Sequence, residues 1–276
     1  LDLSSLGSHS DSAHDWKRMK TLRRLSIAAL LALLLTNLVG PPARAASVNC
    51  ITTDSATGST ITGSFAITDN VVTGHTNCAG SAVVPTGVTS IGDRAFDGAS
   101  SLISISIPDT VTSIGGQAFR GASSLTSITI PKSVTSIGST AFQTATNLAS
   151  ITFDPESKLT TIGPDAFVDT AIQIIAIPNS VTSIGYAAFA GARFLTSVTI
   201  PNSVTSIGDR AFDGASSLKA ITIPKSVISI GNFAFRDNTA LQAVTFETCL
   251  LYTSDSATKR IVRCYALLVS LRHTLH

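Results

Sequence analysis

The feature that most constrains this chain is a motif that recurs seven times between residues 88 and 235. Each copy holds an Ile-Gly pair and, four residues after the Gly, a Phe that follows Ala; successive Phe residues lie 22 or 23 residues apart, with one interval of 25. Residues 88–102 and 204–218 are identical. A repeat of this length predicts a solenoid, because each copy is too thin to bury its own apolar face and must stack on its neighbours. The seven Phe residues are Phe96, Phe119, Phe142, Phe167, Phe189, Phe212 and Phe235.

The repeat that ends at Phe142 shows what each copy is expected to form. Residues 125–130 alternate β-branched or Leu residues with small polar ones, a pattern typical of a half-buried strand. Pro131 ends this strand because it cannot donate to a ladder. A second extended piece is expected to end at Ile137, and Gly138 is expected to permit the turn that places Phe142 in the core. The expected fold class is therefore a repeat solenoid that is mostly β, with short turns or 3-10 segments on its convex side.

The string Leu125-x-x-Ile128-x-Ile130, followed by Pro-x-Ser-Val-Thr-Ser-Ile-Gly-x-x-Ala-Phe, resembles the BspA-like class of bacterial leucine-rich repeats. The resemblance covers about residues 85–246 and implies a leucine-rich-repeat stack of seven repeats of about 23 residues. It also implies a surface protein, since members are often involved in adhesion to host or neighbouring cells.

Two departures from the family pattern are visible. Asp154-Pro155-Glu156-Ser157-Lys158 adds two residues to the fourth repeat, which predicts a local bulge or bend. In place of the usual Asn or Cys after the strand, the chain has hydroxyl residues, for which we predict a hydroxyl ladder between neighbouring backbones. They are Thr110, Ser133, Ser180, Ser203 and Ser226.

The N-terminal region is expected to direct export. Residues 19–45 have a basic start, an apolar run of about 15 residues and a small-residue cleavage site, as in a signal peptide. A membrane anchor is the competing interpretation, although the run is shorter than the roughly 20 residues that span a bilayer. Residues 1–18 are expected to be upstream translation, and the mature chain is expected to begin near Ala46.

Three further segments follow from this frame. Residues 46–84 are expected to form an N-terminal cap, in which Cys50 and Cys78 are expected to form a disulfide as exported cysteines commonly do. The solenoid is expected over 85–248. The tail over 249–276 begins with a string that resembles a translated transposon end, so it is expected to be an artefact; the alternative is a genuine cap with a helix over 266–271.

Neither composition nor motifs indicate chemistry. Charged residues make up 13% of the chain and the net charge is +2, so the field that binding of nucleic acid or anionic lipid needs is not expected. His75 and Cys78 are half of a metal site at most, and a loop His beside a disulfide is the simpler interpretation. The acidic pairs of the duplicated segment are expected to be solvated turn residues. We therefore expect no enzyme activity, cofactor or metal.

The remaining candidate is surface, on a secreted or cell-surface protein. Strand positions that face the concave side are small and nearly uncharged. Such a surface suits a broad contact with a protein or carbohydrate ligand. We expect no nucleic-acid partner, and no membrane insertion after the signal peptide is cleaved. The alternative is a spacer or targeting arm of a longer secreted protein, such as an enzyme. Four larger apolar residues break the repeat pattern, and each is interpreted either as a contact residue or as local packing: Ile174, Tyr186, Phe194 and Phe233. The candidate contact residues are Ser127, Thr129, Ser150, Thr152, Ile174, Ser197, Thr199, Thr222, Thr245, Tyr186, Phe194 and Phe233.

Overall fold

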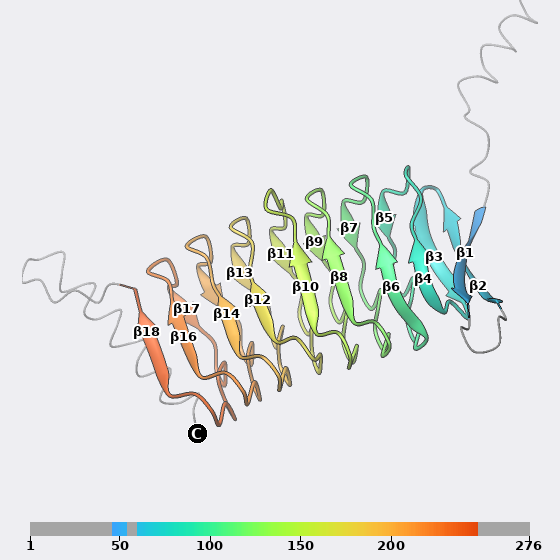
Figure 1. Ribbon diagram of the computed structural model, residues 1–276. Helices are drawn as coiled ribbons and strands as arrows, with labels where there is room; N and C mark the ends of the chain where they lie inside the picture. Colours follow the sequence, from blue (N-terminus) through green and yellow to red (C-terminus); the bar gives the residue numbers. More distant parts are fainter. Residues whose placement is uncertain (1–45, 54–59, 248–276) are drawn as a thin grey trace, which may run out of the picture. The chain divides into compact units, whose positions relative to one another are not determined.

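A computed structural model describes residues 46–53 and 60–247 of this chain (Figure 1). The chain divides into two compact units, 1–44 and 45–276, and every described residue belongs to the second. The predictions for the leader and for the tail lie outside the described residues. Within them the fold is a β-solenoid, and no helix there is long and apolar enough to cross a membrane. The predicted fold class is confirmed.

Each turn of the solenoid contributes one short and one long strand, and we number the turns 1 to 7 by their Phe residues. All seven short strands lie parallel in one sheet, and like residues pair across it, as Ile114 pairs with Ile137. The short strands are β5 (Ser90–Ile91), β7 (Ser113–Ile114), β9 (Ser136–Ile137), β11 (Thr161–Ile162), β13 (Ser183–Ile184), β15 (Ser206–Ile207) and β17 (Ser229–Ile230).

The long strands form the opposite face of the stack in three parallel groups, in which β6 pairs with β4 (Gly80–Val83), β8, β10, β12 and β14 form a four-stranded sheet, and β16 pairs with β18. Their alternating pattern of buried and exposed residues follows the alternation in the sequence. They are β6 (Leu102–Ser106), β8 (Ser127–Ile130), β10 (Ser150–Phe153), β12 (Ile174–Ala176), β14 (Ser197–Thr199), β16 (Ala220–Ile223) and β18 (Ala243–Phe246).

An antiparallel meander closes the first turn and joins the two faces. It comprises β1 (Ala46–Thr53), β2 (Thr60–Thr68) and β3 (Val71–Thr76). Strand β3 pairs with β5, whereas β1 pairs with β4 (Gly80–Val83), which pairs with β6. A disulfide joins Cys50 to Cys78, with the Cα atoms 5.3 Å apart. The cap thus covers the first turn with backbone that is already paired.

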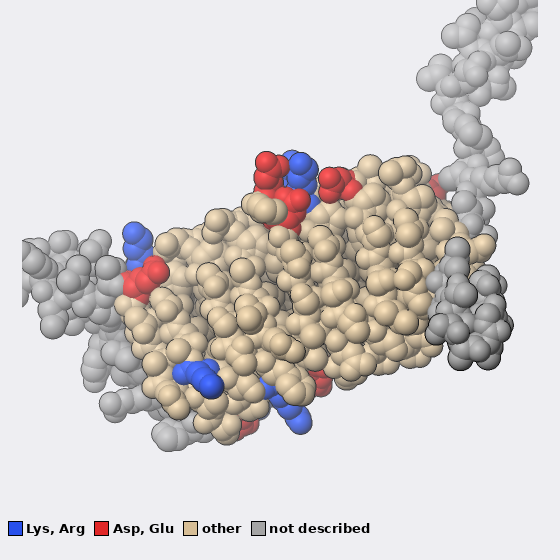
Figure 2. All heavy atoms as spheres, viewed as in Figure 1, with Lys and Arg blue, Asp and Glu red and all other residues tan. Residues whose placement is uncertain are grey.

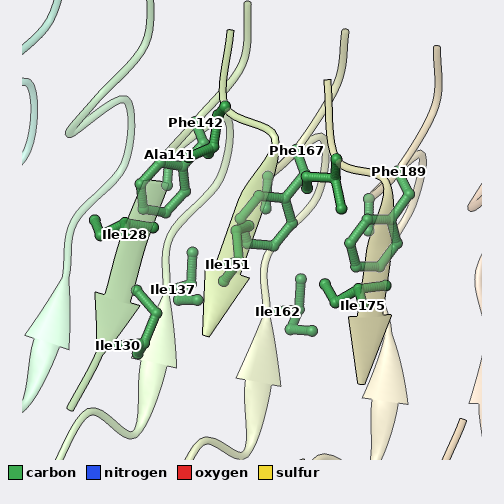
Figure 3. Close-up of a cluster of buried hydrophobic side chains, with 14 of the residues drawn as sticks. Ile128, Ile130, Ile137, Ala141, Phe142, Ile151, Ile162, Phe167, Ile175 and Phe189 are labelled. Carbon is green, nitrogen blue, oxygen red and sulfur yellow. The ribbon is translucent and has the colours of Figure 1, made fainter. Parts of the chain in front are cut away.

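The core is a single column of Phe rings flanked by rows of Ile, Val and Leu. Neighbouring rings stack with centroids 5.1–5.6 Å apart and planes within 10° of parallel. Figure 3 shows three of these rings, Phe142, Phe167 and Phe189, beside the inward residues of the strands. Because each of the five inner rings contacts the rings of both adjacent turns, the column connects all seven repeats.

The Gly of each Ile-Gly pair has a different role from the one expected. Gly138 does not have a positive φ, so the turn itself does not require it. A Cβ at Gly138 would lie 2.6 Å from the carbonyl carbon of Gly115 in the preceding turn. Glycine is required there because the backbones of adjacent turns approach closely. The left-handed conformation falls two residues later, at Thr140 (φ 52°).

The hydroxyl ladder predicted from the sequence is present in four of its five positions. Ser133, for example, donates to the carbonyl of Val111 in the preceding turn over 2.6 Å. Thr110, Ser180 and Ser203 make the same bond at the same distance. Ser226 is the exception, because its buried hydroxyl has no partner.

The irregular fourth repeat affects only the long-strand face. The insertion at Asp154 forms a loop in which the Asp154 carboxylate accepts from the Glu156 backbone. Strand β10 pairs at four positions with β8 but at only one, Ser150 with Ile174, with β12. Strand β11 keeps both of its neighbours. The predicted local irregularity is therefore present, and the short-strand sheet continues past it.

Candidate functional site

The long-strand face presents two columns of small uncharged side chains. One column continues through Ser127 and Ser150 and the other through Thr129 and Thr152, and all four side chains are exposed. In Figure 2, charged side chains lie mainly along the edges of this face and its middle carries none. Because β8, β10, β12 and β14 are in parallel register, each column repeats once per turn. The other predicted residues in the columns are Ile174, Ser197, Thr199, Thr222 and Thr245.

Only one of the four larger apolar candidates lies on this face. Ile174 projects from β12 with 64% of its surface exposed, in the column where neighbouring turns carry Ser150 and Ser197. Phe194 (60% exposed) lies in the chain reversal before β14. Tyr186 lies in the same reversal, shortly after β13, and Phe233 lies in the corresponding reversal after β17. All four candidates are exposed, and so are Val83, Ile103 and Ile228, which the sequence did not single out.

We call this chain reversal the turn edge; it lies between the short and long strand of each turn, such as residues 92–101 in turn 1. Here the duplicated segment forms bonds between turns. Asp93 accepts from the backbone N–H of Gly116 over 2.7 Å, and Asp209 accepts from that of Asn232 over 2.7 Å. Both are exposed turn residues, as expected, and each carboxylate also hydrogen-bonds to the next turn. Asp213 of the second acidic pair, in contrast, is buried.

Two ion pairs repeat the same arrangement four residues further on. Arg120 of turn 2 donates twice to Asp97 of turn 1, and Arg236 of turn 7 donates twice to Asp213 of turn 6. The side-chain hydrogen bonds, and then the charge of each carboxylate, raise the pKa of both guanidinium groups. The two acidic pairs of the duplicated segment are Asp93 with Asp97 and Asp209 with Asp213. Neither is arranged as a catalytic pair, because each carboxylate accepts a hydrogen bond from the following turn.

Phe233 is the centre of an aromatic and cationic cluster at the turn edge of turns 6 and 7. The guanidinium carbons of Arg210 and Arg236 lie 5.8 and 5.2 Å from the centre of its ring. Phe233 has a positive φ of 57°, so its ring projects from a left-handed residue at the surface. The cluster combines residue types that are enriched in binding hot spots.

The same edge is hollow in turns 1 to 3. A hollow of about 450 Å³ opens between Asp93 and Ser139, where Gly116 has no side chain. It was not predicted from the sequence, where its signal is the Gly116-Gln117 pair that follows the first copy of the duplicated segment. Its lining residues are Asp93, Arg94, Gly116, Gln117, Ser139 and Thr140.

His75, the other candidate for chemistry, stabilises the cap. Its Nδ1 lies 3.2 Å from the carbonyl oxygen of Ala95, and its ring stacks on Phe96 with centroids 5.9 Å apart. In later turns the equivalent carbonyl accepts from the backbone of the preceding turn, as Ala118 accepts from Phe96. Among the described residues, no three His, Cys, Asp or Glu side chains are grouped so that they would hold a metal ion.

Comparison with known proteins gives a consistent family. The family model described as "BspA type Leucine rich repeat region" matches residues 74–195 and 187–262, with six copies. A leucine-rich cell surface protein from Faecalibacterium prausnitzii is similar in structure, with a TM-score of 0.55 and 28% identity; the match covers 74% of this chain and 56% of that one. The leucine-rich repeat protein of T. pallidum has a TM-score of 0.60 and 27% identity, covering 72% and 91%. No curated protein matches. The chain belongs to the BspA-type leucine-rich repeat family.

Proposed function

We propose that the chain is a binding or adhesion module of the bacterial cell surface or its surroundings, without catalytic machinery. The long-strand face is the contact surface, for a protein or carbohydrate partner. The observation that carries the proposal is the continuous, exposed and uncharged pair of columns on that face. Covering such a surface removes water from few charges, so the desolvation cost of a broad contact is small.

The description of a similar protein supports the same proposal. The similar structure from Faecalibacterium prausnitzii is described as a cell surface protein. This chain spans 56% of the length of that protein, so a surface location and any further activity of the whole protein are proposals here. Ile174 is the large apolar side chain among small ones in its column, and 64% of its surface is exposed to a partner.

The test places charge in the middle of the face. A triple variant of the full chain, Thr129→Arg, Thr152→Arg and Thr199→Arg, is compared with the wild type for binding to films of mucin and of extracellular-matrix proteins. The matched control is the double variant Asn179→Arg and Asn202→Arg, at exposed positions in the turns that follow β12 and β14. We expect at least a tenfold loss of binding in the triple variant only. Equal binding by all three proteins would contradict the proposal.

A spacer or targeting arm is the second candidate function. One observation favours it: the two columns contain no Trp, Tyr or Arg, the residue types that provide most interface hot spots. The genomic sequence across the codon for Glu247 distinguishes the two functions. A reading frame that continues into a catalytic or wall-binding domain supports the arm, whereas a stop soon after this repeat leaves the face as the functional surface.

A further inference from the structure

The hollow of turns 1 to 3 lies on the turn edge, separate from the long-strand face. Backbone bonds set its depth, because Arg94 donates to the carbonyl of Gly116 and Gln117 to that of Ser139, each over 2.9 Å. A Cβ at Gly116 would have its nearest contacts at 3.5 Å, on Ser139, and 3.6 Å, on Asp93. A side chain at position 116 would therefore start in ordinary van der Waals contact with both walls and extend into the hollow without displacing them.

The walls are oriented by hydrogen bonds that leave further donors and acceptors free. The Nε of Arg94 donates to Oε1 of Gln117 over 2.6 Å, so the two terminal nitrogens of the guanidinium and the amide nitrogen of Gln117 remain available. Oδ1 of Asp93 accepts from Gly116, so Oδ2 remains available as an acceptor. Each of these polar groups is planar, fixed by one bond and able to make more.

The second copy of the segment lacks this arrangement although its own residues are identical. The position of Gly116 is occupied by Asn232 and that of Gln117 by Phe233. The guanidinium of Arg210 consequently lies over the ring of Phe233, whereas that of Arg94 is held by the amide of Gln117. The first copy is thus followed by Gly116 and Gln117 with turn 3 beyond them, whereas the second copy is followed by Asn232 and Phe233 in the last turn that the structure describes.

The chemistry of the walls identifies the ligand class. One carboxylate and one guanidinium balance each other, an amide and hydroxyls supply uncharged partners, and the lining includes no large apolar residue. Neighbouring hydroxyls of a sugar both donate and accept, and planar amide, carboxylate and guanidinium groups pair with them two at a time. The volume of about 450 Å³ lies in the usual range for small-ligand sites. We infer that this hollow binds a neutral saccharide, at a site independent of the long-strand face.

The experiment uses the full chain and a panel of neutral oligosaccharides of glucose, galactose, mannose and N-acetylglucosamine, with saturation-transfer NMR and then calorimetric titration of the strongest binder. Gly116→Tyr fills the hollow with the side chain that turn 5 carries at the same position, Tyr186, so the turn accommodates it. Gln117→Phe removes the amide and reproduces turn 7. Asn232→Tyr makes the first change in the other copy and is the matched control.

We expect at least a tenfold loss of affinity in Gly116→Tyr and in Gln117→Phe, with wild-type affinity in Asn232→Tyr and unchanged thermal midpoints in all three. The inference is overturned if no saccharide of the panel binds, or if Asn232→Tyr weakens binding as much as Gly116→Tyr. It is also overturned if the triple Arg variant of the long-strand face abolishes saccharide binding while Gly116→Tyr leaves it intact, because the saccharide site would then lie on that face.

Discussion

The two copies of the duplicated segment, 88–102 in turn 1 and 204–218 in turn 6, have the same sequence but different surroundings. Both form the same backbone bonds, the same Asp contact with the next turn and the same bidentate ion pair. The two copies differ in their neighbours. The first packs against the cap, through His75, and borders the polar hollow. The second packs between the Phe rings of turns 5 and 7 and borders the cluster of Phe233 with Arg210 and Arg236. The segment determines its own turn, whereas its neighbours determine its surface and its stability.

The largest effect is expected where the Phe column is interrupted. Phe96→Ala and Phe212→Ala each remove a fully buried ring, and each is expected to lower the free energy of unfolding by about 3–5 kcal/mol. Urea unfolding followed by circular dichroism measures the loss. If the copies differ, Phe96 should cost more, because its ring contacts three rings, Phe65, His75 and Phe119, whereas Phe212 stacks on two, Phe189 and Phe235. A loss below about 1 kcal/mol at either site would contradict a continuous column.

Removing the disulfide is expected to destabilise the first copy of the duplicated segment and to leave the second copy unchanged. Cys50→Ala with Cys78→Ala opens a loop of sequence separation 28 and is expected to cost about 3–4 kcal/mol in the cap. Hydrogen exchange should accelerate at the amide of Phe96 and remain unchanged at that of Phe212, which is five turns away. Equal acceleration at both amides would mean that the stack unfolds as a single unit and that the ends are not independent.

A smaller effect is expected from His75. His75→Phe keeps a ring on Phe96 but removes the donor to the buried Ala95 carbonyl, at an expected cost of about 1–3 kcal/mol. The thermal midpoint measures the loss, and Thr73→Val on the same strand is the control, since the hydroxyl of Thr73 is exposed. A midpoint equal to that of the wild type would mean that water replaces the His75 donor.

The smallest effect is expected from the two ion pairs. Arg120→Met and Arg236→Met should lower the thermal midpoint slightly, and both losses should shrink at high salt because exposed charges are screened. The loss should be larger for Arg236, since the side chain of its partner Asp213 is 10% exposed and that of Asp97 is 22% exposed. The opposite order would mean that the ring of Phe233 holds Arg236 without the help of Asp213.

Much of the fold was predictable because the same residue pattern occurs seven times and predicts the same local structure in each copy. The strand positions, the Phe column, the hydroxyl ladder and the irregular fourth turn all follow from periodicity and residue type. The role of Gly138 was not predictable, because it depends on how closely the backbone of one turn approaches that of the next. The sequence singled out the four large apolar candidates one by one. Coordinates were required to place Ile174 on the long-strand face and Tyr186, Phe194 and Phe233 on the turn edge.

The sequence by itself determined that this protein is a stack of turns with one large ring per turn, since a repeat of about 23 residues is too thin to bury its own apolar face and must stack on its neighbours. Only the tertiary structure decided which side chains of successive turns meet. A hollow appears where Gly116 and Gln117 follow the segment, and a stacked cluster appears where Asn232 and Phe233 follow it. The physical reason is that these surfaces are built between turns, from residues about 23 positions apart, so no single repeat contains them.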